Sequence, residues 1–199
     1  MHDFSQVITQ LQNTYFLPIL LTLLAVAYLI YINQRKISLI WMGFKTRYCL
    51  NHLGLEQISN LNCPDGMGHD FTIDRLILRH DGITLLVYKK YPGKIFCADN
   101  IADWTQMLGR KSYRFKNPLF ELDYQIKAVS SCIPNIPVNG YLFFDHLSHF
   151  PKGHPERIIH PDNIPEMLSR NNRHQVEVPV MAAWKNIQQL LLQERAVQN

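Results

Sequence analysis

An uncharged stretch near the N-terminus constrains the fold of this chain more than any other feature. No charged side chain stands between Asp3 and Arg35, a gap of 31 residues, and the centre of the gap, residues 15–32, reads YFLPILLTLLAVAYLIYI. As a helix, this centre would be about 27 Å long at ~1.5 Å per residue, close to the ~30 Å hydrocarbon core of a bilayer. The sequence therefore predicts a short N-terminal segment, residues 1–14, and one transmembrane helix with its basic flank, residues 15–36.

The charges on either side of this stretch predict its orientation. Only His2 and Asp3 precede it, whereas Arg35 and Lys36 follow it directly. Basic residues favour the cytoplasmic side, so we expect a single-pass protein of the inner (plasma) membrane with its C-terminal part in the cytoplasm. A cleaved signal peptide fits less well, because a basic start and a cleavage site between small residues are both missing. A buried core helix is the remaining alternative.

Residues 37–199 have the length of one domain and enough apolar residues to bury a core. The four cysteines are widely spaced and contain no C-x-x-C pair, which predicts neither a zinc ribbon nor a disulfide framework. A formal net charge of +4 and a pI near 8.9 are compatible with nucleic acid or anionic lipid as partners.

Periodicity and turn residues predict an α/β domain. Apolar residues continue at loosely helical spacing from Ile37 to about Asn60, and His80-Asp81-Gly82 predicts the turn of a β-hairpin over residues 71–91. Later segments predict a helix, a buried strand and a final helix, in the order Asn117-Pro118 onward, YLFFD after Asn139-Gly140, and residues 179–195. We expect a mixed central sheet flanked by helices on both faces.

The hairpin carries a motif that is found in a known family. Residues 71–95 read FTIDRLILRHDGITLLVYKKYPGKI, and Trp104 and the tripeptide Asn117-Pro118-Leu119 follow in the same order. Over about residues 51–145, this order resembles the nuclease-related domain (NERD) family. The resemblance implies a restriction-endonuclease-like fold and a metal-dependent nuclease ancestry.

The resemblance also implies a site. In such a site, an acidic residue on one strand and a carboxylate-x-lysine on the next hold Mg²⁺, which polarises the phosphoryl group and activates water. Asp74 matches the first acid and Lys89 the lysine, and we expect both to face one side of the hairpin. Val87, however, stands two residues before Lys89, where the family has its second carboxylate. Because valine has no ligand oxygen, we predict a degenerate site.

Two carboxylates offer an alternative to loss of activity. Glu121, at the glutamine position of the family's NPLxQ pattern, and Glu56, if its helix reaches the site, each carry an oxygen donor. In the alternative, Asp74 and Glu121 ligate Mg²⁺ and Lys89 assists. Simpler roles are also open: Asp74 pairing with Arg75 or Arg79, Glu121 favoured at a helix N-terminus, and Lys89 and Lys90 solvated on an edge strand.

The stretch GRKSYRFK, residues 109–116, interleaves basic and aromatic residues. Its candidate contacts to nucleic acid are Arg110, Lys111, Tyr113, Arg114 and Lys116. Basic groups neutralise phosphates and rings stack on bases, so we expect DNA or RNA to bind there. A solvated loop with its aromatics on the core, and attraction to anionic headgroups, are the alternatives.

The histidines His146, His149, His154 and His160 are irregularly spaced and interrupted by prolines, so we expect a surface loop rather than a zinc site. Walker, dinucleotide-binding, nucleophile-elbow and H-E-x-x-H motifs do not occur in the sequence. Two functions remain. The first is a non-catalytic nucleic-acid-binding or structural subunit of a membrane-associated assembly, such as secretion or conjugation machinery, without a small-molecule cofactor. The second is an active metal-dependent nuclease.

Overall fold

The structure is a computed structural model that describes residues 3–64, 70–168 and 175–197. The chain divides into two compact units, Met1–Phe44 and Lys45–Asn199. Each unit is described by itself.

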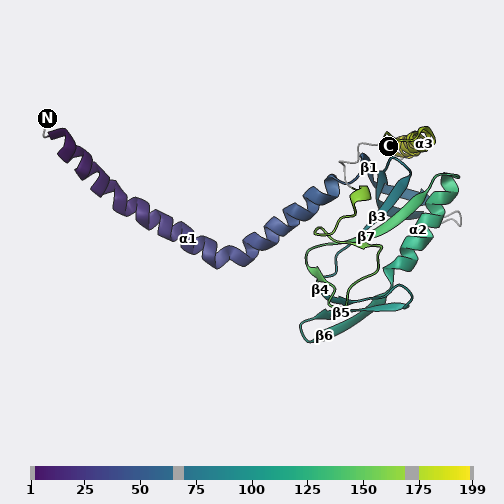
Figure 1. The fold of residues 1–199 in the computed structure, drawn as a ribbon, viewed down its shortest axis with the longest axis horizontal. Coiled ribbons are helices and arrows are strands. Elements are labelled where there is room, and N and C mark those ends of the chain that lie inside the picture. The colour runs from purple at the N-terminus through teal and green to yellow at the C-terminus, as the bar shows by residue number, and fades with distance from the viewer. Residues whose placement is uncertain (1–2, 65–69, 169–174, 198–199) are drawn as a thin grey trace. The chain divides into compact units, whose positions relative to one another are not determined.

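The first unit is formed by most of helix α1 (Asp3–Asn51), coloured from purple to blue in Figure 1. The part of α1 from Pro18 to Asn51 is long and apolar enough to cross a membrane. Its mean hydropathy is 1.3 over an 18-residue window, and 0 % of that window is buried. The large apolar side chains of residues 18–32 are exposed rather than packed in a core of this chain. The helix begins at Asp3, so residues 3–14 continue it without a break.

The second unit contains a five-stranded mixed sheet in the order β1-β2-β3-β7-β9. Its strands are β1 (Glu56–Pro64), β2 (Asp70–Leu78), β3 (Ile83–Lys89), β7 (Val138–Phe144) and β9 (Ile158–Ile159). β1, β2 and β3 pair antiparallel, whereas β3 with β7 and β7 with β9 pair parallel. The predicted hairpin is therefore present, and β3 lies in the centre of the sheet.

Helical segments cover both faces of this sheet. On one face, α2 (Pro118–Cys132) and α3 (Val178–Val197) pack on the larger core cluster, to which Leu85, Leu122 and Trp184 belong. On the other face, the last turn of α1 and the short 3₁₀ helix η1 (Glu166–Leu168) bury Leu50 and Leu168 against the sheet. The expected mixed α/β architecture is confirmed.

A second sheet of four strands, in the order β6-β5-β4-β8, follows the hairpin (Figure 1). Its strands are β4 (Gly93–Phe96), β5 (Asp103–Leu108), β6 (Lys111–Lys116) and β8 (Ser148–His149). Ile95 and Trp104 of this sheet are fully buried in the larger core cluster. The same apolar cluster therefore supports both sheets.

Three predictions of local structure were wrong. The helix continuing α1 ends at Asn51, and Glu56 lies on strand β1 rather than on a helix. Residues 111–116, expected as a loop, form strand β6, and the expected histidine-rich loop contains β8 and β9 with the buried pair Ile158 and Ile159. Each of these strands is short or exposed, so its pattern in the sequence is weak.

Candidate nuclease-like site

Asp74 and Lys89 lie on the two paired strands of the hairpin, β2 and β3. Lys89 is two residues after Val87, which belongs to the larger core cluster, and alternate residues of a strand share a face, so Lys89 faces the side covered by α2. On β2, Ile73 and Leu76 both belong to that cluster, so the alternation of side chains is interrupted at Asp74 and Arg75.

The carboxylate of Asp74 is bound to the neighbouring strand. Its Oδ2 accepts a hydrogen bond of 2.7 Å from the backbone N–H of Tyr88. The backbone pairing between β2 and β3 ends at Arg75 and Leu86, and the side chain of Asp74 bonds to β3 just beyond this pair. Arg75 and Arg79 donate hydrogen bonds to Gln57 and Asp81, while the charge of Asp74 also acts on Arg75.

Lys89 pairs with Glu121, which lies in the first turn of α2. The distance from Nζ to Oε2 is 2.9 Å, and the lysine is mostly buried whereas the glutamate is exposed. The expectation of a solvated lysine on an edge strand is wrong for Lys89, because β3 lies between β2 and β7. The structure therefore brings two of the four candidate catalytic side chains into direct contact.

Val87 stands two residues before Lys89, at the second carboxylate position of the motif, and is 5 % exposed. It packs in the larger core cluster with Leu85 on one side and faces the helix layer. A carboxylate at this position would project from the same face as Lys89. The side chain that replaces it is an apolar part of the core and offers no ligand atom.

Glu56 is bound by the C-terminal helix. Its Oε2 accepts a hydrogen bond of 2.7 Å from Nε1 of Trp184 and a longer one of 3.4 Å from Nε2 of Gln188. Trp184 is fully buried and its indole N–H needs an acceptor, which Glu56 supplies. Glu56 therefore has a structural role, because its contact joins strand β1 to helix α3.

The donor set does not fit a Mg²⁺ site. Asp74, Glu121 and Glu56 each have a protein partner, and Val87 contributes no oxygen. Among the described residues, these three carboxylates do not form a group whose ligand atoms all lie within 4.8 Å of one another. Mg²⁺ binds hard oxygen ligands at ~2.0–2.1 Å, so a shared cation would require the three carboxylates to leave their present partners.

Two other features of the motif have structural roles. Gly93 has φ +93°, and a Cβ built on it would lie 2.4 Å from the carbonyl oxygen of Met107. Only glycine fits at this position, because it needs both the left-handed conformation and the close approach of β5. Next to it, the ring of Tyr91 stacks on Phe115 at 4.3 Å between centroids.

The tripeptide Asn117-Pro118-Leu119 starts α2, and its asparagine forms hydrogen bonds to the preceding loop. Oδ1 of Asn117 accepts from the N–H of Leu119 at 2.9 Å, and Nδ2 donates to the carbonyl oxygens of Asp99 and Ile101, each at 2.9 Å. Asparagine suits this N-cap because it supplies an acceptor to the helix and donors to the loop together, and Pro118 fits the first turn.

Comparison with known families identifies the domain. A family model described as the nuclease-related domain matches residues 44–145, just over half of the chain. The chain belongs to the nuclease-related domain family. The restriction-endonuclease-like fold implied by the sequence resemblance is consistent with this membership. Comparisons with curated proteins and with solved structures found no match.

The basic stretch of this nuclease-related domain forms the edge of its second sheet. β6 pairs only with β5 among the described strands, and the turn between them is Gly109-Arg110. The side chains that the sequence singled out are exposed on this edge: Arg110, Lys111, Tyr113, Arg114 and Lys116. Phe115 alone turns inward, onto Tyr91 and Trp104.

Charge on this edge is only partly neutralised by acids. Lys116 lies 3.4 Å from Oδ1 of Asp103 on the paired strand, and both side chains are solvent-accessible. Such exposed pairs are weak, so Lys116 retains most of its attraction for an external anion. Together with Tyr113 the edge offers cations and an exposed ring, the two components of a single-stranded nucleic-acid surface.

Sequence reasoning missed one group of side chains. His146, His160 and Asp162, separated by up to 16 positions in the chain, have ligand-type atoms that all lie within 4.8 Å of one another. Their grouping follows from strand pairing between β7 and β9, which is only two residue pairs long. The spacing of the histidines in the sequence contained no signal of it.

Proposed function

We propose that this nuclease-related domain binds nucleic acid without cleaving it and is held at the cytoplasmic face of a membrane by α1. The observation that carries the non-catalytic part is Val87. It occupies the second carboxylate position of the family motif and is buried in the core beside Lys89. The metal that such a site would hold lacks an essential ligand, and the remaining carboxylates are occupied by protein donors.

Binding to nucleic acid is supported by the β6 edge, which we define as Arg110, Lys111, Tyr113, Arg114 and Lys116. An exposed strand edge lined with cations attracts the phosphate backbone over a long range and without sequence preference. Tyr113, 46 % exposed, provides a ring on which a base stacks. We infer that the edge tracks single-stranded DNA or RNA.

Attachment to a membrane is supported by the exposed apolar surface of α1. Residues 18–32 expose leucine, isoleucine and aromatic side chains, an arrangement that is costly in water and favourable in lipid. Arg35 and Lys36 follow this surface, so the second unit would lie on the cytoplasmic side.

The experiment is a salt titration of binding. The full chain, in nanodiscs of zwitterionic lipid so that anionic headgroups do not contribute, is titrated against fluorescent single-stranded DNA. In the triple variant Arg110→Gln, Lys111→Gln, Arg114→Gln we expect at least a tenfold weaker Kd at low salt. The slope of log Kd against log salt should fall by about 2, because each lost phosphate contact removes ~0.7 from it for a single strand.

The matched control removes three positive charges elsewhere in the second unit, at the exposed Lys127, Lys152 and Lys185. This variant has the same net charge and should bind within about twofold of the wild type. Equal losses in the two variants would mean that only net charge matters. No measurable binding by the wild type at low salt would contradict the proposal and favour a structural subunit of a membrane-associated assembly.

A further inference from the structure

We propose that His146, His160 and Asp162 bind a divalent transition-metal ion, with Zn²⁺ as the best fit. This side-chain group, called here the His-His-Asp cluster, lies at the carboxyl ends of β7 and β9. All three residues follow the segment 44–145 that the family model matches, so membership of the family does not assign this site.

The fold brings the three residues together through parallel strands. Leu142 and Phe143 of β7 pair with Ile158 and Ile159 of β9. His146 follows the end of β7 by two residues and His160 follows β9 directly, so both histidines leave the same edge of the sheet. A tight turn, closed by the N–H of Asn163 on the carbonyl of His160 at 2.8 Å, returns Asp162 toward them.

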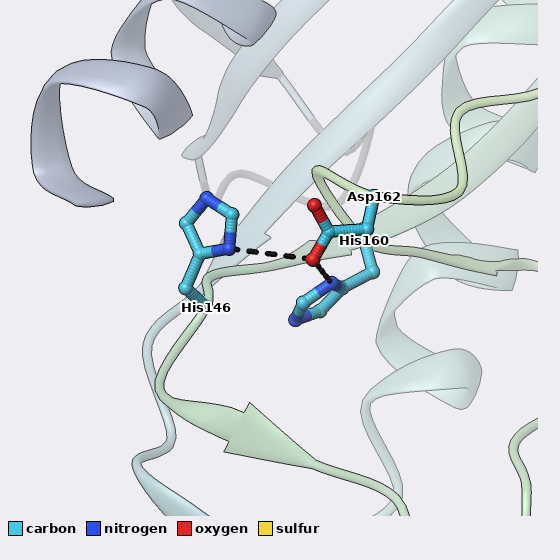
Figure 2. A group of neighbouring side chains, drawn as sticks. All are labelled: His146, His160 and Asp162. Carbon is cyan, nitrogen blue, oxygen red and sulfur yellow. Dashed lines mark ion pairs between the residues drawn. The ribbon is translucent and has the colours of Figure 1, made fainter. Parts of the chain in front are cut away.

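Three donor atoms converge in this cluster, as Figure 2 shows. Oδ2 of Asp162 lies 3.6 Å from Nδ1 of His146 and 3.5 Å from Nδ1 of His160. The two imidazole rings are nearly perpendicular, at 88°, with 5.5 Å between their centroids. Nδ1 is therefore the nitrogen of each ring that faces the carboxylate, and Nε2 of each ring is buried without a hydrogen-bond partner among the described residues.

These separations match those between ligands of one zinc ion. They exceed the ~2.7–3.2 Å of an ordinary hydrogen bond. Two ligands that each lie ~2.0–2.1 Å from a tetrahedral Zn²⁺ are roughly 3.3 Å apart. Each histidine Nδ1 thus lies about as far from the carboxylate oxygen as two ligands of one zinc ion lie from each other, and the ligand atoms of all three residues are within 4.8 Å of one another.

Lys45 holds the aspartate in the orientation that the site needs. Its Nζ lies 2.6 Å from Oδ1 of Asp162, which leaves Oδ2 directed at the two histidines. Outer partners of this kind orient metal ligands in proteins. His146 is 8 % exposed, His160 19 % and Asp162 58 %, so the cluster is closed on the imidazole side and accessible to solvent on the carboxylate side. A fourth ligand, such as water, can enter from there.

The test measures zinc directly. The full chain, purified in detergent with a tag that lacks histidine, is stripped with a chelator, loaded with Zn²⁺, passed through a desalting column and analysed by elemental mass spectrometry. We expect one equivalent of zinc per chain. A chromophoric chelator in competition then gives the affinity, and Co²⁺ in place of Zn²⁺ should give visible d–d bands of a low-coordinate nitrogen and oxygen site.

The informative variants are His160→Gln and Asp162→Asn, each expected to weaken zinc binding at least tenfold and to abolish the Co²⁺ bands. Asp162 is exposed enough that Asp162→Asn should keep the fold, which circular dichroism checks. His149→Gln with His154→Gln is the matched control, because these histidines belong to the same segment but not to the cluster. Substoichiometric zinc on the folded wild type, or full binding by folded Asp162→Asn, would overturn the proposal and leave a metal-free polar cluster.

Discussion

Lys89 and Glu121 form an ion pair between the end of β3 and the first turn of α2, with 2.9 Å between Nζ and Oε2. The lysine of the nuclease motif thus has a carboxylate partner, but one that comes from a helix instead of from position 87. The negative charge in the first turn also suits the helix dipole. The pair gives the mostly buried ammonium group of Lys89 a counter-charge beside the apolar Val87.

This pair should contribute little to stability. Glu121 is exposed, and exposed pairs are worth ~0.2–1 kcal/mol. We expect the double-mutant cycle of Lys89→Met and Glu121→Gln, measured by urea unfolding, to give a coupling free energy in that range. The cycle of Lys90→Met with Glu121→Gln is the control and should give no coupling. A coupling above about 2 kcal/mol would mean that the two groups act as a buried unit.

Asn117 should matter more than any of the candidate catalytic residues for folding. It is 2 % exposed, caps α2 and donates to two carbonyl groups of the preceding loop. Asn117→Ala removes the cap and leaves buried groups unpaired, so we expect a loss of about 2–4 kcal/mol in the free energy of unfolding.

The matched variant is Asn117→Asp, which keeps the cap acceptor but loses the Nδ2 donor to the loop. Its stability should fall between those of the wild type and Asn117→Ala. If the two variants were equally stable, the contacts to Asp99 and Ile101 would contribute nothing.

The stability of the metal-free chain should fall as the pH is lowered from the ordinary histidine pKa of 6.5, and His146 should account for part of the fall. Its pKa is lower in the folded state, mainly through burial, while Asp162 and Asp145 oppose the effect and His160 and Lys45 add to it. The unfolded chain then binds more protons in this window, so stability rises with pH.

The measurement is chemical unfolding between pH 5 and pH 7.5 for the wild type and for His146→Gln, which cannot titrate. The variant should show a shallower dependence on pH. His149→Gln removes an exposed imidazole from the same segment and is the control for the substitution itself. Identical profiles for the wild type and His146→Gln would show that burial does not perturb this imidazole.

The sequence predicted those parts of the fold in which local pattern and tertiary structure agree. The apolar runs on either side of the turn at Gly82 gave the hairpin β2–β3, and Asn117-Pro118 gave the start of α2. Strand β1 was missed because Ile58 continues the helical spacing of α1, while Asn60, at φ 55°, interrupts the alternation expected of a strand. Strand β6 was missed because most of its side chains are exposed and polar.

The candidate site, like the fold, was predicted only where local sequence determines the structure. The placement of Asp74 and Lys89 on adjacent strands follows from the hairpin, which the sequence predicts. The partners of Glu56 and Glu121 depend on where α3 and α2 pack, and the His-His-Asp cluster depends on a parallel pairing of two-residue length. Contacts between such distant segments have no local signal, so residue spacing alone predicted none of them.

Cleavage of nucleic acid by the purified full chain tests the account most directly. Wild type, Asp74→Ala, Lys89→Ala and Glu121→Ala are incubated with labelled single- and double-stranded DNA and RNA, with Mg²⁺ or Mn²⁺ and with a chelator. The account predicts that the wild type cleaves no faster than the variants or the chelated sample. Cleavage by the wild type that requires either metal and is lost in Asp74→Ala and Lys89→Ala would contradict it, and would place the missing carboxylate at Glu121 if that variant were also inactive.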